Sequence, residues 1–73
     1  MTPRYHINLF WSDEDEAWIA DVPDLTYCSA HGATPEEALR EVQVAMQAWL
    51  EAQREAGRPD PELRRYRPVP AAA

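Results

Sequence analysis

The fold is decided by residues 34–57, which read TPEEALREVQVAMQAWLEAQREAG. Thr34 is a favoured N-cap residue, Pro35 suits the first helical position, and Glu37 completes a Thr-x-x-Glu capping box. The glycine that closes the stretch is typical of the position just after a helix, and the prolines beyond it prevent continuation. The stretch therefore predicts one long helix over residues 35–56.

Apolar side chains recur along this predicted helix at steps of three and four residues, which places them on one face. The stripe consists of Leu39, Val42, Met46 and either Trp49 or Leu50, and it ends at Gln53. A helix of this length spans about 33 Å. Such a helix needs a sheet to cover its apolar face.

Two runs before the helix have the period of two that is typical of half-buried strands. In the first run, residues 5–11, one side carries Tyr5, Ile7, Leu9 and Trp11, and the other carries His6, Asn8 and Phe10. In the second run, residues 17–22, one side carries Trp18, Ala20 and Val22, and the other carries Ala17, Ile19 and Asp21. The polar residues between the runs suit a hairpin connection. We expect a third strand at residues 26–30, with Gly32 as a break before the helix.

These elements predict an α+β fold, in which a three-stranded antiparallel sheet carries the helix on one face in the order β-β-β-α. A short fourth strand at residues 63–66 is an open alternative. We assign residues 1–62 to one domain and residues 63–73 to a tail rich in arginine and proline, with a frayed end. The three tryptophans, Trp11, Trp18 and Trp49, are expected to share the core between sheet and helix.

A domain of 73 residues buries a modest share of its surface and usually needs additional stabilisation. Cys28 is the only cysteine, so no internal disulfide can form, and self-association as a dimer or tetramer is the expected source. Phe10, Ala17 and Ile19 lie on the side of the strands away from the helix and are the candidate oligomer interface. No apolar run approaches the roughly 20 residues of a membrane span, and no secretory signal pattern precedes the first strand. A lone thiol suits a reducing compartment, so we expect a cytoplasmic protein.

The charge is unevenly distributed. The net charge is −6, with seven arginines and no lysine, and residues 1–33 carry six acids against one arginine. An acidic half repels phosphate backbones, which disfavours nucleic-acid binding and favours a basic protein partner. Charge kept for solubility alone is the alternative explanation.

The acidic run consists of Asp13, Glu14, Asp15 and Glu16. It lacks the glycine turn and the distant glutamate of a calcium loop, so we interpret it as a solvated turn or a partner-binding patch, with no metal or cofactor. Two histidines and one cysteine are weak support for zinc, and Cys28 is expected to be a small buried apolar residue.

The order of several short elements resembles the HicB-like antitoxin family. The residues concerned are Trp18-Ile19-Ala20-Asp21-Val22-Pro23-Asp24-Leu25, then Cys28, Gly32, Thr34 and Glu37-Ala38-Leu39. The resemblance covers about residues 4–61. It departs from the family pattern at Thr26-Tyr27, where members carry Pro-Gly, and at Ala33, where an acid is usual.

The resemblance implies a degenerate ribonuclease H-like fold, a dimer or tetramer, and neutralisation of a small basic RNA-cleaving toxin by occlusion. Residues 57–73 are too few for the DNA-binding domain of many family members, so direct DNA binding is not expected. An orphan oligomeric scaffold or small-ligand binder of the same fold is the alternative. A divergent Mg²⁺-dependent nuclease that uses Asp21 and Asp24 is the least favoured, because convergence of these carboxylates is unsupported.

Overall fold

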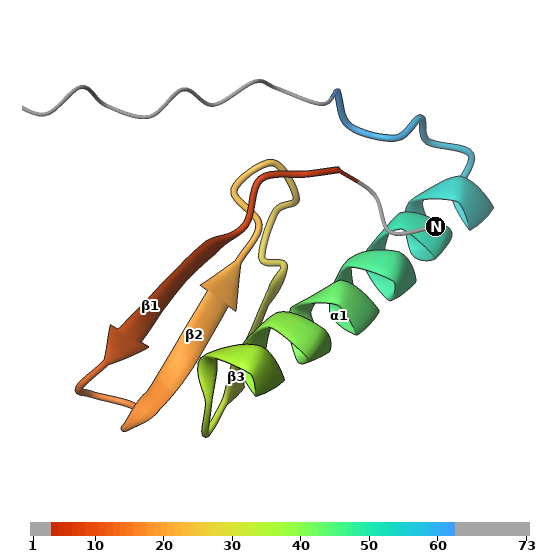
Figure 1. Ribbon diagram of the computed structural model, residues 1–73. Coiled ribbons are helices and arrows are strands. Elements are labelled where there is room, and N and C mark those ends of the chain that lie inside the picture. The colour runs from red at the N-terminus through yellow and green to blue at the C-terminus, as the bar shows by residue number, and fades with distance from the viewer. Residues whose placement is uncertain (1–3, 63–73) are drawn as a thin grey trace, which may run out of the picture.

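The computed structural model describes residues 4–62, so the predicted strand at residues 63–66 and the rest of the tail lie outside the described part. Its elements are β1 (Asn8–Ser12), β2 (Ala17–Asp21), β3 (Ser29–Gly32) and α1 (Pro35–Glu55) (Figure 1). The strands form one antiparallel sheet in the order β1-β2-β3, and α1 lies along one face of it. The predicted α+β fold is therefore confirmed. The helix found in this part of the chain is not long and apolar enough to cross a membrane.

The strand register divides the sheet into two faces. Phe10 lies opposite Ile19, which lies opposite His31, and this row faces away from α1. The next row is Leu9, Ala20 and Ala30, and it faces α1, because Ala20 is buried in the same core as the helix. The two predicted sides of the hairpin strands are therefore confirmed.

A single core lies between the sheet and α1. Its buried members are Tyr5, Ala20, Val22, Leu25, Cys28, Ala38, Val42, Met46 and Leu50. The predicted stripe is confirmed at Val42, Met46 and Leu50, but it is wrong at Leu39, whose side chain is 37% exposed. Ala38 takes the core position instead, at a point where the backbone of α1 lies close to Gly32 of β3.

The helix termini follow the capping residues. Thr34 has an extended backbone, and its hydroxyl oxygen accepts a hydrogen bond of 3.1 Å from the Glu37 N–H. At the other end Ala56 is the C-cap and Gly57 has φ 76°, the left-handed conformation that favours glycine. The predicted helix is therefore confirmed to within one residue.

The predicted third strand is wrong in position, because residues 22–28 form a closed loop. The Leu25 N–H donates to the Val22 carbonyl, the Cys28 N–H donates to the Leu25 carbonyl, and the Val22 N–H donates to the Cys28 carbonyl. Leu25 and Cys28 are buried within this loop, and the strand therefore begins only at Ser29 and ends at Gly32. Gly32 is consequently the last residue of β3 and not a break. The first strand likewise begins later than predicted, at Asn8.

The shared tryptophan core is only partly confirmed. Trp18 and Trp49 pack against the buried cluster, and the Trp49 indole N–H donates to the Thr26 carbonyl at 2.9 Å. Trp11 is 47% exposed and contacts the Trp18 ring edge-on, with ring centroids 5.8 Å apart. The reason is its place on β1, the strand at the far side of the sheet from β3, against which α1 packs most closely.

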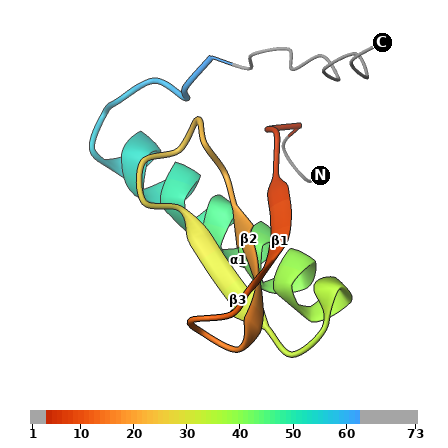
Figure 2. The same cartoon turned by 90° about the vertical axis from the view of Figure 1, so that its left-hand side faces the viewer.

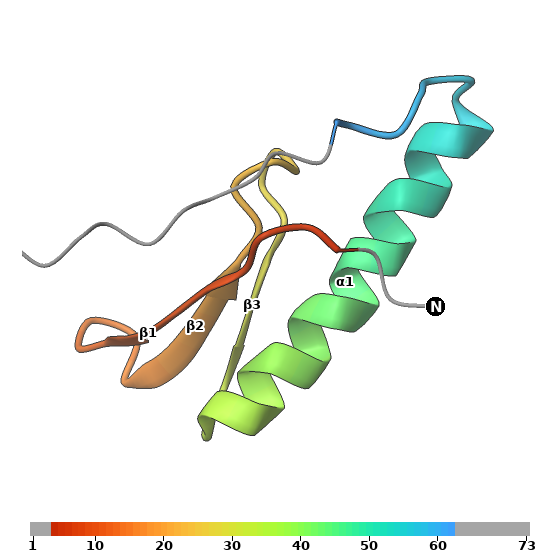
Figure 3. The same cartoon turned by 45° about the horizontal axis from the view of Figure 1, so that its top comes forward.

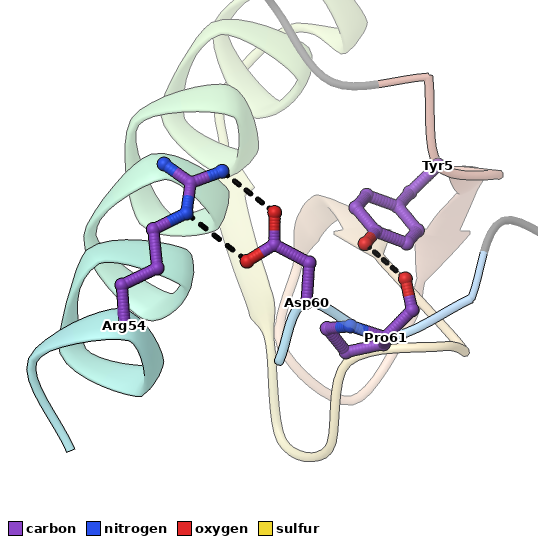
Figure 4. A network of polar contacts seen from close by, with 4 residues as sticks. All are labelled: Tyr5, Arg54, Asp60 and Pro61. Carbon is purple, nitrogen blue, oxygen red and sulfur yellow. Dashed lines mark hydrogen bonds and ion pairs between the residues drawn. The ribbon is translucent and has the colours of Figure 1, made fainter. Parts of the chain in front are cut away.

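A polar clasp joins the two ends of the described chain (Figure 4). The Tyr5 hydroxyl donates to the Pro61 carbonyl, and the Arg54 guanidinium donates two hydrogen bonds to the Asp60 carboxylate. This pairing lowers the pKa of the Asp60 carboxyl. Burial raises the pKa of Tyr5, and the nearby Asp60 carboxylate adds to the shift, so the hydroxyl keeps its proton as a donor.

Tyr27 has a strained backbone. Its φ is 60°, a conformation that costs a side-chain-bearing residue roughly 1–2 kcal/mol, and its side chain is 99% exposed. We therefore expect Tyr27→Gly to raise the free energy of unfolding by about 1 kcal/mol, since no packing is lost. Urea unfolding followed by tryptophan fluorescence measures the change. Tyr27→Ala keeps the strain and is the control; an equal gain from both variants would contradict this explanation.

Candidate protein-binding surface

One face of the sheet carries no helix or strand within residues 4–62. In Figure 2 the sheet lies in front of α1, and Figure 3 shows α1 on one side of the sheet only. Phe10 and Ile19 are direct cross-strand neighbours at the centre of this outer face, and Ala17 lies two residues before Ile19 on β2. Phe10 is 47% exposed, and the other two side chains are half-buried. The structure therefore brings the three predicted interface residues together.

The acidic residues predicted to bind a partner form the turn between β1 and β2. Asp13, Glu14, Asp15 and Glu16 are all exposed. The turn is held by its own polar contacts: Trp11 Nε1 donates to Asp13 at 2.8 Å, and the Ser12 hydroxyl donates to Asp15 at 3.1 Å. No group of three or more His, Cys, Asp or Glu side chains within residues 4–62 is arranged to hold a metal ion.

The topology places further carboxylates beside this turn. The β1–β2 turn and the connection from β3 to α1 lie at the same end of the domain, as Figure 1 shows, because β2 runs antiparallel to both neighbours. Glu36 and Glu37, in the first turn of α1, therefore lie at the end that carries residues 13–16. We call these six acids the acidic end. The strand pattern in the sequence could have revealed this grouping, which we did not predict.

Two open depressions flank β3. The first, of about 420 Å³, lies on the outer face and is lined by Asp15, Ile19, Ser29, Ala30 and His31. The second, of about 520 Å³, lies between β3 and α1 and is lined by Ser29, Ala30, His31, Glu37, Glu41, Val44 and Ala45. Each depression combines carboxylate and apolar side chains. This combination suits arginine or lysine, whose aliphatic stem packs on apolar surface while its charged end pairs with an acid.

The position of β3 adds backbone groups to this surface. It pairs only with β2 among the described strands, so its other edge can accept an extended chain by strand addition. Side chains of an added strand alternate between the two faces, and the two depressions lie on opposite sides of β3. An extended basic segment on β3 would therefore direct alternate side chains towards Asp15 and towards Glu37 and Glu41.

The residues considered for catalysis are placed differently. Asp21 ends β2 opposite Asn8 and Ser29, while Asp24 lies in the loop that follows. Cys28 is buried as predicted, and burial raises the pKa of its thiol, which disfavours the nucleophilic thiolate. His6 precedes β1 and contacts the Asn8 amide oxygen through Nε2 at 2.7 Å. These four residues line neither depression, whereas His31, the other histidine, lines both.

Comparison with family models, with curated proteins and with solved structures finds no match to this chain. The likeness to HicB-like antitoxins consequently depends on the residues quoted above alone.

Proposed function

We propose that this chain is a non-catalytic protein-binding module that binds a basic partner at β3 and the acidic end. The observation that carries the proposal is the pair of depressions on opposite sides of β3, each with at least one carboxylate. Carboxylates at such a surface increase the rate of association with a basic protein and select against acidic ones. The net charge of −6 acts in the same direction.

The resemblance to HicB-like antitoxins supports a more specific partner, a small basic RNA-cleaving protein that is neutralised by occlusion. The degenerate ribonuclease H-like relationship belongs to this proposal as well. An oligomeric scaffold or small-ligand binder of the same fold is the competing function. Open depressions of a few hundred Å³ fall within the size range of ligand pockets, which is the observation that favours it. The competing functions differ in whether a basic protein binds.

The test uses the protein encoded beside this chain, where that protein is small and basic. Calorimetry should detect a complex whose affinity falls as salt is added, because salt screens the charges. We expect Glu37→Gln with Glu41→Gln to weaken the complex about tenfold, since both carboxylates line the second depression. Inhibition of RNA cleavage by the partner should weaken in parallel.

The matched control is Glu51→Gln with Glu55→Gln, which removes the same charge from the other end of α1. This control should change the affinity by less than about twofold. Equal loss in the two double variants would contradict binding at β3 and would indicate long-range attraction alone. A basic neighbour that neither binds nor loses its activity would exclude the antitoxin function and leave the scaffold.

A further inference from the structure

The free edge of β1 differs from the edge at β3. β1 is the outermost strand on its side of the described sheet and reads Asn-Leu-Phe-Trp-Ser. Proteins usually protect exposed edges with lysine, proline, a bulge or an inward-pointing charge, and β1 contains none of these. Its five residues pair with β2 in continuous register. The edge is therefore regular, uncharged and open to pairing.

β1 also carries apolar side chains on both faces. Phe10 lies on the outer face, and Leu9 and Trp11 lie on the face towards α1. These three side chains are 47%, 41% and 47% exposed, respectively. Strands of an antiparallel sheet with one solvated face normally alternate apolar and polar residues, so exposed apolar side chains on both faces of β1 are unusual. An exposed apolar group of this kind at an unprotected edge favours contact with another protein chain.

We propose that two copies of this chain pair through β1, antiparallel and centred on Phe10. A two-fold axis perpendicular to the sheet keeps both α1 helices on the same face, so residues that lie opposite each other must share a face. Centring on Phe10 fulfils this condition and pairs all five residues of β1. Phe10 then lies opposite Phe10 of the second copy, and Leu9 opposite Trp11. Aromatic and aliphatic cross-strand pairs of this kind stabilise sheets.

The charges around β1 favour the same arrangement. Antiparallel pairing brings the segment before β1 of one copy towards the β1–β2 turn of the other. That segment begins with the exposed Arg4, and the turn ends with Asp15 and Glu16. Arg4 of each copy therefore lies towards the acidic turn of the other copy at both ends of the seam. A parallel arrangement would instead set the two acidic turns side by side, which like charges disfavour.

The resulting sheet has six strands in the order β3-β2-β1-β1-β2-β3. Its outer face joins Phe10 and Ile19 of both copies into one apolar surface, while each β3 remains at an outer edge. Self-association therefore leaves the proposed partner site of each copy accessible. The two interactions are separable, and the dimer is measured on this chain without any partner.

The decisive experiment is a charge exchange at the seam, measured on the full chain by sedimentation equilibrium. The wild type should show twice the 8.4 kDa mass of one chain. Phe10→Lys and Phe10→Glu should each be monomeric, since like charges then lie directly opposite each other. An equimolar mixture of the two variants should recover the dimer. Recovery by mixing requires that residue 10 meets residue 10, which is the feature specific to this register.

Two controls complete the experiment. Val44→Lys adds the same charge at a 62% exposed apolar residue of α1 and should leave the dimer intact. Ile19→Lys changes the outer face on β2 and should also leave a dimer paired through β1 intact. A dimer formed by stacking two outer faces would instead dissociate in this variant. A monomeric wild type overturns the proposal. Dissociation by Ile19→Lys, or no recovery in the mixture, also overturns it.

Discussion

Gly32→Ala should destabilise this domain by about 3 kcal/mol, although it adds a single methyl group. A Cβ at Gly32 would lie 2.6 Å from the backbone nitrogen of Ala38 and 2.9 Å from the Cβ and Cγ atoms of Glu37. The backbone of α1 cannot move away without opening the core at Ala38. A domain of 73 residues is stable by roughly 4–11 kcal/mol, so this loss is a large fraction.

Urea unfolding followed by tryptophan fluorescence measures the loss, and Gly57→Ala is the matched control. Nothing lies within 4 Å of a Cβ at Gly57, so only its φ of 76° makes alanine unfavourable there, at a cost of about 1 kcal/mol. If Gly32→Ala lost no more stability than Gly57→Ala, the close approach of α1 to β3 would be wrong. Since Glu37 lines the second depression, the same variant should also weaken binding of a basic partner.

Met46→Ala is the second change with a large expected effect, a loss of about 2–5 kcal/mol. Met46 is fully buried at the centre of the face of α1 that covers the sheet. Removing its side chain loses apolar burial and leaves a cavity that the surrounding side chains fill only in part. Chemical denaturation, with circular dichroism at the helix signal, is the appropriate measurement.

Leu39→Ala on the same helix is the control for Met46→Ala. Both variants introduce alanine into α1, so a difference between them reports core packing and not helix propensity. Leu39 is 37% exposed, so we expect a loss of about 1 kcal/mol or less. A loss at Leu39 as large as the loss at Met46 would show that α1 is rotated, with the originally predicted stripe facing the sheet.

The parts of the fold that were predictable from sequence depend on local chemistry. Thr34, Pro35 and Glu37 define the start of α1 through capping, which involves only neighbouring residues. Strand alternation likewise placed Phe10 and Ile19 on one face, because the period of two holds in any sheet. These local rules recovered the helix, the hairpin and the apolar part of the candidate surface.

The errors arose where distant parts of the chain meet. The rotation of α1 buries Ala38 and exposes Leu39, and it accompanies the close approach of α1 to Gly32. The spacing of apolar residues along the helix carries no information about this contact. The late start of β3 follows from the closed loop that buries Leu25 and Cys28. For the same reason Glu37 and Glu41 could not be assigned to the surface beside β3 before α1 was placed on the sheet.

The clasp between Tyr5 and Pro61 has a kinetic consequence. Successive elements of this domain contact one another in chain order, β1 with β2, β2 with β3 and β3 with α1, so most of its structure closes short loops and should fold rapidly. The clasp instead joins residues 56 positions apart. We expect it to form last and to open first, as a local fluctuation that separates Tyr5 from Pro61 while the hairpin and the helix stay folded.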